Sequence, residues 1–530
     1  MEQIWHEGKR RLGMQLLVRE GIFASIMYAM TSVFLVAFAL ALGANAFYVG
    51  LLNSIPNVFW TIALVPSAIL TQHYMRKRKS ILVGATTLSR LMWLGILMLP
   101  IAFTGWSLAG LMVFVTLASI ISAFSSPAWA SITGDIVPDY VRGRYFSRRL
   151  AYTTVAGLGA ELIAGWVLDF FGRGNMFGFI VIFGVGMLAG LTSSALLWQV
   201  PEPPLQLEHR AHTISAMRNA LRDGRLRRFL LALGFFEFAV MVASPFFTVH
   251  LLNALRAEYI WIAILAVASG VAGISVQRAW GRFSDRYGHR VILIISAFWI
   301  VLVPLLWIPV PPEYLYLLVV AEAFSGAVWA GYNLSYFNYM LEISPVAERP
   351  VYSALTNVVF GVAGITGPVI GGLIASAFVV SPLFGIAGIT EIRAVFLVSG
   401  ILRMIGAAML GLLLMEAIEK RERVAPSHVF SEMVRSGLLG TLLKAHNAAG
   451  LIKHDAFAAK NSLRGAITSV EKSVASTVKA IENAIDHVAI ESDKEGDKIA
   501  EHARACLFGT RVGEKANYRI GKKLRVKVSE

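Results

Sequence analysis

Charge and cysteine are both scarce in this chain of 530 residues. Only 15% of the residues are charged, and the single cysteine is Cys506. One cysteine excludes an intramolecular disulfide and a metal site built from several cysteines. The sequence also lacks a G-x-x-x-x-G-K-[ST] loop and an H-E-x-x-H helix, so neither P-loop ATP hydrolysis nor zinc proteolysis is indicated. We therefore expect no enzyme, no cofactor and no metal site.

Apolar residues, in contrast, are abundant. They make up 56% of the chain, more than a soluble domain needs. About 20 consecutive apolar residues cross a bilayer as a helix, and the chain provides that length repeatedly. The first such stretch has no A-x-A-like cleavage site behind it, which argues against a signal peptide. The sequence predicts an all-α polytopic membrane protein with twelve transmembrane helices, at residues 21–44, 46–70, 81–103, 107–132, 146–170, 176–199, 229–252, 259–280, 291–311, 313–341, 351–380 and 394–415.

The placement of basic residues predicts how these helices are oriented. The net charge is +15, and the basic clusters fall in alternate connections, for example at 76–79 and 142–149. The opposite connections carry only Arg173, Arg256 and Arg393. Because cytoplasmic loops are rich in lysine and arginine, both termini are predicted to be cytoplasmic. We expect an integral multi-pass protein of the cell (plasma) membrane, and no nucleic-acid partner, since this asymmetry accounts for most of the basic charge.

Internal similarity predicts two repeated halves. Residues 122–130 resemble residues 322–330 at an offset of 200, and five positions between 138 and 165 recur at an offset of 207. Such self-similarity at a fixed spacing indicates repeated structural units. We predict an N-terminal six-helix bundle at 1–199, a cytoplasmic linker at 200–228 with an amphipathic surface helix, a C-terminal six-helix bundle at 229–416, and a cytoplasmic helical tail at 417–530.

A dense group of charges interrupts the apolar pattern at residues 281–290, which read GRFSDRYGHR. Its counterpart in the first half is 68–77, which has Gln72 in the place of Asp285. With this motif the chain resembles the major facilitator superfamily of secondary transporters, whose signature is G-x-x-x-D-R-x-G-R-R/K. Here His289 replaces the usual arginine. Residues 135–144 resemble the family's loop between the fourth and fifth spans.

A second glycine motif supports the resemblance, which covers residues 15–416. Residues 364–372 look like the family's G-P-x-x-G-G pattern, which usually marks the fifth span of antiporters and here falls on the eleventh. Small residues let membrane helices approach closely. In the family, the fifth and eleventh spans slide against the eighth and second at the interface between halves, so the resemblance implies a moving interface here.

The resemblance also implies a gating motif. Asp285 would lie at the cytoplasmic end of the eighth span, where a carboxylate can cap the start of the fifth span and meet Arg142 or Arg144. This contact would form when the cytoplasmic side is closed. The matching latch in the first half should be weak or absent, because Gln72 carries no charge. The predicted gating residues are Gly281, Asp285, Arg286, Gly288, Arg290 and Arg142.

Five ionisable residues fall inside predicted spans: Glu161, Glu237, Glu322, Arg90 and Arg403. Such groups are costly in lipid and normally pair or face a water-filled cavity. All three glutamates are candidates for proton coupling. The family resemblance favours Glu237 and Glu322, because spans one, four, seven and ten line the family's central cavity. The alternative is intramembrane pairing, of Glu161 with Arg90 and of Glu322 with Arg403.

The same reasoning predicts a substrate cavity with aromatic and lightly polar walls. Aromatic residues at helical spacing also occur in ordinary packing, and this alternative stays open for each of them. A cavity of this kind with acidic residues suits a neutral or cationic amphiphile. The candidates are Trp129, Trp329, Tyr332, Asn333, Tyr28 and Ser126.

The tail contains a seven-residue apolar pattern at 463–488. This pattern predicts either a short coiled coil, and with it weak self-association, or an amphipathic helix lying on another surface.

Together these features predict a secondary active transporter that moves a small solute by alternating access. We expect coupling to protons, with another ion as the alternative. The direction of transport stays open, and export is one of the alternatives. The partners expected are a small-molecule substrate, the coupling ion and the lipid bilayer. One alternative is a non-transporting membrane receptor or scaffold that acts through its C-terminal tail. Another is a lipid flippase or facilitator.

Overall fold

The structure is a computed structural model that describes residues 7–74, 77–102, 105–202, 213–345, 348–380 and 391–415. The predicted tail, with its pattern at 463–488, lies outside the described residues. Contacts divide the chain into two units. The larger contains residues 1–273 and 296–417, and the smaller contains the described segment 274–295. The two units are described separately below.

Every regular element among the described residues is a helix, and twelve helices are long and apolar enough to cross a membrane. The predicted number of spans is therefore confirmed. The helices of the first half are α1 (Glu7–Met30), α2 (Leu35–Ala41), α3 (Ala46–His73), α4 (Arg78–Ala102), α5 (Ser107–Ala123), α6 (Ser125–Ile136), α7 (Asp139–Phe171) and α8 (Met176–Gln199).

The second half follows a short connecting helix, α9 (Thr213–Ala220), which packs on α16. Its helices are α10 (Gly224–Ala243), α11 (Phe246–Val249), the π-helix η2 (His250–Ala254), α12 (Ile260–Tyr287), α13 (His289–Ile300), α14 (Leu302–Trp307), the 3₁₀-helix η3 (Pro312–Tyr314), α15 (Tyr316–Ile343), α16 (Arg349–Val380) and α17 (Glu391–Met415).

Four of the membrane spans are interrupted, which hydropathy alone does not predict. The first span breaks between α1 and α2, the fourth between α5 and α6, the seventh between α10 and α11, and the ninth between α13 and α14. Proline explains three of these breaks, because its nitrogen has no hydrogen to donate to the carbonyl four residues earlier. The prolines are Pro127, Pro245 and Pro304. Pro304 therefore cannot donate a hydrogen bond to the carbonyl of Ile300, and this carbonyl is free to accept one from another group.

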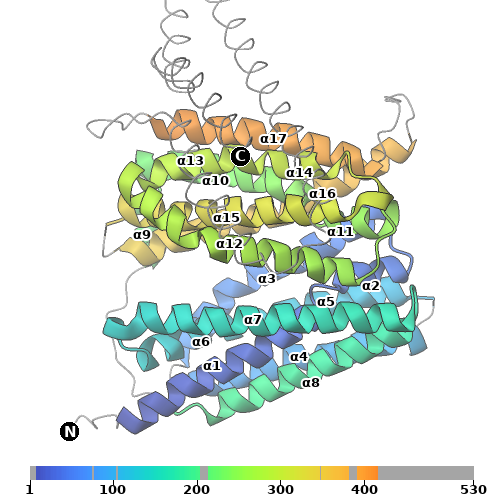
Figure 1. Cartoon of the computed structure of the whole chain (residues 1–530). Helices are drawn as coiled ribbons and strands as arrows, with labels where there is room; N and C mark the ends of the chain where they lie inside the picture. Colours follow the sequence, from blue (N-terminus) through green and yellow to red (C-terminus); the bar gives the residue numbers. More distant parts are fainter. Residues whose placement is uncertain are drawn as a thin grey trace, which may run out of the picture. The chain divides into compact units, whose positions relative to one another are not determined.

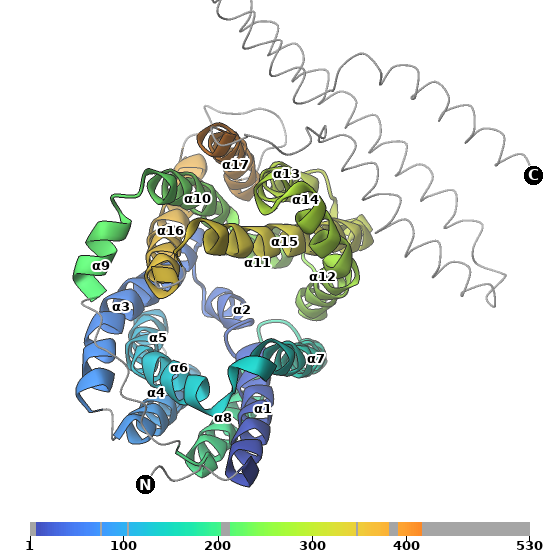
Figure 2. The same ribbon diagram turned by 90° about the vertical axis from the view of Figure 1, so that its left-hand side faces the viewer.

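Within the larger unit, helices from the two halves pack side by side. In the first half α1 lies against α7 and α8 (Figure 1), and α3 lies against α16 of the second half (Figure 2). Glycines allow this last approach. A Cβ atom on Gly50 would collide with the carbonyl of Pro368, and one on Gly372 would lie 3.1 Å from the Cα of Phe47. Both contacts place backbone against backbone across the two halves.

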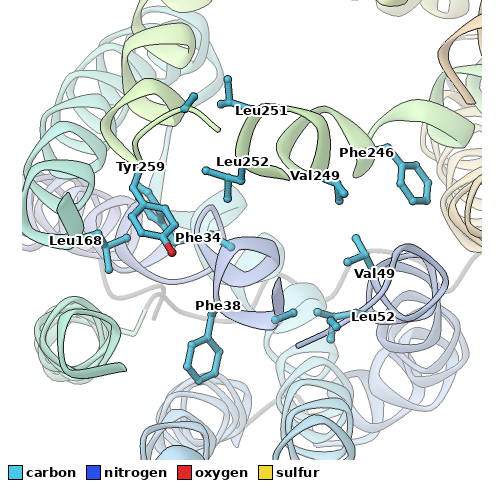
Figure 3. Close-up of a cluster of buried hydrophobic side chains, with 14 of the residues drawn as sticks. Phe34, Phe38, Val49, Leu52, Leu168, Phe246, Val249, Leu251, Leu252 and Tyr259 are labelled. Carbon is cyan, nitrogen blue, oxygen red and sulfur yellow. The ribbon is translucent and has the colours of Figure 1, made fainter. Parts of the chain in front are cut away.

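A cluster of buried apolar side chains joins the two halves at one end of the bundle (Figure 3). The first half contributes residues from α2, α3 and α7, and the second half contributes residues from α11, η2 and the start of α12. The labelled members are Phe34, Phe38, Val49, Leu52, Leu168, Phe246, Val249, Leu251, Leu252 and Tyr259. We call the end of the bundle with this cluster and the loops at 42–45, 172–175 and 255–259 the packed end.

Candidate functional site

Glu237 is a buried carboxylate of the second half. Its side chain is on α10 and is 7% exposed. The hydroxyl of Tyr332, on α15, donates a hydrogen bond of 2.9 Å to Oε1 of Glu237. Tyr332 itself is fully buried, so it packs inside the bundle and does not line an open cavity.

Arg403 is a buried cation that attracts this carboxylate electrostatically. Its guanidinium, 2% exposed, donates to Oγ of Ser399 at 3.1 Å and to the carbonyls of Ile300 at 3.2 Å and Val240 at 3.4 Å. The carbonyl of Ile300 is the one that Pro304 leaves without its helical donor. Arg403 therefore joins α17 to α13 and α10 through backbone groups.

Glu322 is the second carboxylate of this group. It lies on α15 and accepts a hydrogen bond of 3.2 Å from Nε1 of Trp307. The guanidinium of Arg403 attracts both glutamates electrostatically. In the described part of the chain, however, neither glutamate makes a direct ion pair with it. We call Glu237, Glu322, Arg403, Tyr332 and Trp307 the second-half cluster.

The second-half cluster has two carboxylates and one guanidinium in an apolar surrounding. Removing each ion from water costs several kcal/mol, which an opposite charge offsets only in part. With one cation for two acids, one negative charge has no counter-charge. A proton on either carboxylate would balance the cluster, so this arrangement can take up and release a proton.

Aromatic rings surround Tyr332. The rings of Trp329 and Tyr332 meet edge to face with centroids 5.2 Å apart, and Phe236 and Tyr336 also contact Tyr332. Trp329 is half-buried, whereas its neighbour Asn333 is exposed. Of these predicted cavity residues, Asn333 is thus exposed and Tyr332 is enclosed.

His250 is a protonatable residue that the sequence analysis missed. It is fully buried on η2, and its ring packs edge to face on Phe396 with centroids 5.3 Å apart. Neither ring nitrogen has a hydrogen-bond partner among the described residues. One histidine within an apolar run was the only signal of it in the sequence.

A second group of buried charges lies in the first half. Arg90, on α4, donates to the hydroxyls of Ser193 and Ser194 on α8. Glu20, 5% exposed, accepts from Arg149 at 3.1 Å and from Ser193 at 3.2 Å. We call these five residues the first-half cluster. It contains two guanidiniums and one carboxylate, the opposite balance to the second-half cluster.

The structure does not bring Arg90 and Glu161 together. Arg90 is held by the two serines and attracted by Glu20, while Glu161 lies between α7 and α1. Sequence analysis missed Glu20 because the hydropathy of the first span begins at residue 21, whereas α1 begins at Glu7. The span is therefore longer than its apolar part.

Trp129 belongs to this first-half region. Its ring lies 5.2 Å from the guanidinium carbon of Arg149, a cation–π contact, and it packs beside Ile132 and Ile136. Ser126, one turn earlier, is exposed. Trp129 thus fixes the arginine that neutralises Glu20.

A cavity of about 430 Å³ lies between α1 and α7. Tyr28 and Ser25 line it from α1, and Thr153 and Glu161 line it from α7. Oε2 of Glu161 is buried and has no hydrogen-bond partner among the described residues. Of the predicted substrate residues, Tyr28 is the one that lines this cavity.

In the smaller unit, the predicted gating motif forms the turn between α12 and α13. Gly288 has a φ of 91°, a conformation that only glycine adopts without strain. Oγ of Ser284 lies 2.5 Å from Nδ1 of His289 across this turn, and the guanidinium of Arg286 lies over the ring of Tyr287. Gly281 and Asp285 belong to the last turns of α12, and Arg290 to the first turn of α13.

Arg142, the predicted partner of this motif, lies in the first turn of α7. It donates to the carbonyls of Gly134 and Val137 at 3.4 Å each and so caps the end of α6. Asp135, beside it, makes an ion pair of 2.6 Å with Arg78 at the start of α4. The contact of Asp285 with Arg142 or Arg144 stays a prediction.

At the packed end, a polar clasp that the sequence analysis missed joins the halves. The carboxylate of Asp169, on α7, accepts hydrogen bonds from the backbone N–H groups of Tyr259 at 2.8 Å and Ile260 at 2.7 Å. Arg173 donates to the carbonyl of Ala257. A Cβ atom on Gly165 would lie 2.8 Å from the Cα of Ile260, so α7 and α12 touch at backbone distance.

Among the described residues, no group of three histidine, cysteine, aspartate or glutamate side chains is placed to hold a metal ion.

Comparison with known proteins gives a family match and several structural neighbours. The family profile described as Major Facilitator Superfamily matches residues 21–276 and again residues 229–468. Two matches, one starting in each half, agree with the repeat seen in the sequence. A search of curated protein sequences finds no match.

Three solved structures illustrate the fold. A bacterial homolog of the human lysosomal transporter Spinster, in an inward-facing and unoccupied conformation, is similar with a TM-score of 0.58 and 17% identity, over 77% of this chain and 97% of that one. The nucleoside transporter NupG is similar with a TM-score of 0.56 and 13% identity, over 76% and 99%. A D-xylose–proton symporter is similar with a TM-score of 0.55 and 13% identity, over 78% and 98%.

Proposed function

Because the chain belongs to the major facilitator superfamily, whose members are secondary transporters and not enzymes, we propose that it moves a small solute by alternating access and couples this movement to protons. The two repeated halves would rock about the site between them, as in other transporters built from repeats. The solute and the coupling ion are the two points that need direct tests.

The observation that carries proton coupling is the charge balance of the second-half cluster. Glu237 and Glu322 share one cation, Arg403, whose position is held by backbone carbonyls and a serine. A fixed cation beside two acids in an apolar medium favours one protonated and one ionised acid. Uptake of a proton from one side and its release to the other would then accompany the exchange between the two states.

The name of one neighbour supports this assignment. The D-xylose symporter is named as coupled to protons, and it shares the fold with this chain. We extend the coupling ion to this chain and not the sugar.

For orientation, we propose that the packed end faces away from the cytoplasm. The positive-inside rule assigns both termini to the cytoplasm, and the packed end is opposite to them along α1. The clasp of Asp169 and Arg173 would then close the outer side. The second state would require this clasp to break and Asp285 to meet Arg142 or Arg144 on the cytoplasmic side, as the gating motif predicts.

Proteoliposomes that contain a pH-sensitive dye test the coupling. A panel of sugars, nucleosides, amino acids, organic cations and organic anions is added, and solute-driven proton movement is recorded. We expect at least one solute to move protons, and Glu237→Gln or Glu322→Gln to reduce this movement at least tenfold. The matched control is Glu313→Gln, which changes an exposed glutamate of the same half.

Two results would contradict the proposal. If no solute moves protons with the wild-type chain while labelled solute still crosses the membrane, the carrier is not proton-coupled. If both glutamine variants keep the wild-type proton movement, the second-half cluster is not the coupling site.

A further inference from the structure

We propose that the cavity between α1 and α7 binds an organic cation, whose ammonium group lies against Glu161. This inference rests on the proposed transport function and names the chemical class of its solute. It assigns to Glu161 the role of counter-ion to the solute, and it leaves proton exchange to the second-half cluster.

The size and lining of the cavity suit a small amphiphile. Its volume of about 430 Å³ is within the range of about 300–1,000 Å³ that is usual for small-molecule sites. The part of α7 that lines the cavity extends from Arg149 to Glu161, which is about 18 Å along the helix axis at 1.5 Å per residue. The remaining wall combines short hydroxyl side chains with apolar ones: Ser25, Thr153 and Thr154 among the former, and Ala24, Ala29 and Leu158 among the latter.

The charge of the cavity favours a cation. Two ionisable groups of opposite sign line it, Glu161 and Arg149. Arg149 already has partners, because it donates to Glu20 at 3.1 Å and to the carbonyl of Leu17 at 3.1 Å. Glu161 has no such partner, and its buried Oε2 accepts no hydrogen bond among the described residues. Glu161 therefore gives the cavity one carboxyl group without a counter-ion. A bound ammonium group would hold this carboxyl in its ionised form, whereas a carboxylate ligand would be repelled by that form.

Tyr28 strengthens the case for an ammonium group. Its phenol lies close enough to Glu161 for an electrostatic interaction, and its side chain lines the same cavity. An aromatic ring beside a carboxylate is a favourable surrounding for a quaternary ammonium ion, because the ring face is negative.

Glu237 is less suited to this role. Its Oε1 already accepts the hydroxyl of Tyr332, and the fully buried tyrosine leaves no room for a ligand at that oxygen. The two glutamates therefore differ in what they can exchange. Glu161 faces a space of molecular size, whereas Glu237 faces side chains.

Three probes that share a phenylethyl group test the proposal on the full chain in lipid nanodiscs. They are trimethyl(2-phenylethyl)ammonium, 2-phenylethanol and 3-phenylpropanoate, with charges of plus one, zero and minus one. Binding is measured by titration calorimetry without a pH gradient. We expect the cation to bind at least tenfold more tightly than either of the others, and Glu161→Gln to remove this preference.

Two glycine variants locate the site. A Cβ atom on Gly157 would lie 3.8 Å from the Cβ of Ser25 across the cavity, so Gly157→Leu should fill the space and abolish cation binding. Gly159 is on the same helix and has open space around it, outside the cavity lining, so Gly159→Leu should bind as the wild type does.

The outcomes separate this inference from the proposed function. If Glu161→Gln and Gly157→Leu bind the cation as tightly as the wild type, the cavity is not the site, whatever the proton measurements give. If the wild type has no preference for the cation, the solute class is wrong, although proton coupling through Glu237 would be unaffected. A Gly157→Leu protein that elutes and melts as the wild type does, yet binds no cation, would support the assignment.

Discussion

At the scale of single residues, the closure of the packed end depends on very few polar groups. Asp169 receives two backbone N–H groups at the first turn of α12, where the positive end of the helix dipole adds to the attraction. Arg173 adds one contact to the carbonyl of Ala257. Most of the buried side chains at this end are apolar and make non-directional contacts. The carboxylate therefore helps to fix the register of α7 against α12.

We expect Asp169→Asn to open the packed end more often. Asparagine has no negative charge and one acceptor oxygen, so about 1–3 kcal/mol of charge-assisted hydrogen bonding is lost. In a Cys506→Ser background, a cysteine in place of the buried Val49 should react with a hydrophilic maleimide about tenfold faster in the Asp169→Asn protein. The control is Glu258→Gln, since that exposed carboxylate lies in the loop before α12. Equal labelling rates for all three proteins would show that the clasp does not hold the end closed.

The sequence predicted the positions of the intramembrane acids and offered Arg403 as a partner of Glu322, but it did not predict the hydrogen bonds that Tyr332 and Trp307 donate to these acids. Glu237 and Glu322 were identified by their depth within apolar runs, and both lie inside membrane-length helices. Their partners lie on other helices. Arg403, for example, donates to the carbonyl of Ile300, which lacks its helical donor because the residue four positions later is Pro304. No local pattern encodes such a meeting. Glu20 was missed for a simpler reason, since it precedes the apolar part of its own helix.

At the scale of elements, glycines set the distances between helices. In α16 the motif at 364–372 serves two neighbours at once. Gly367 and Gly371 approach Met241 and Val242 of α10 in the same half, while Gly372 approaches Phe47 of the other half. The family resemblance assigned this motif to the moving interface. The structure gives it a fixed neighbour as well, so one face of the helix is static and the other crosses the interface.

We expect Gly367→Ala to lower the stability of the second half. The new Cβ atom would lie 2.5 Å from the Cβ of Met241 and 2.8 Å from its carbonyl carbon, which forces a shift of the backbone at a cost of about 1–3 kcal/mol. Gly84→Ala is the matched control, because open space surrounds Gly84 in α4. It should leave the stability unchanged or raise it by up to about 1 kcal/mol. Thermal unfolding in one detergent compares the two, and equal melting temperatures would contradict the packing argument.

The number of helices was predictable and their interruptions were not. Hydropathy depends on composition over about 20 residues, so twelve apolar stretches gave twelve spans. At Phe124 and Val301 the helix is interrupted by the loss of only a few backbone hydrogen bonds, and the residues around both positions are mostly apolar. Hydropathy does not change there, although the helical hydrogen bonding does.

At the scale of the whole molecule, the two halves have the same kind of fold, and their charged clusters have opposite balances of acids and bases. The first-half cluster has Arg90 and Arg149 with one acid, and the second-half cluster has Glu237 and Glu322 with one base. Repetition of the helices has therefore not preserved their polar chemistry. Of these two clusters, only the second-half cluster has a spare acid, whereas the unpaired acid of the first half, Glu161, lies apart from its cluster in the cavity between α1 and α7. We therefore assign the proton to the second-half cluster.

The gating motif predicts a further asymmetry between the halves, because the first half has Gln72 at the position that corresponds to Asp285 in the second half. We expect Gln72→Asp to add a second latch on the cytoplasmic side, to favour the state closed on that side and to slow the transport cycle. Spin labels at Tyr74 and Val351, in a Cys506→Ser background, should show a shorter mean distance. The control is Gln199→Asp, which adds the same charge at the exposed end of α8. An unchanged distance distribution in the Gln72→Asp protein would refute the latch.

The clasp at the packed end has an evolutionary consequence, because it recognises the main chain. Asp169 and Arg173 bind two backbone N–H groups and a carbonyl, which every residue at 257 and every residue except proline at 259 and 260 would supply. Selection for this contact therefore acts on the charged side chains of Asp169 and Arg173 in the first half. In the second half it acts only on the size and shape of the residues that pack there. The loop at 255–259 can diverge among descendants of this protein, within the limits of packing, while the halves continue to find the same register.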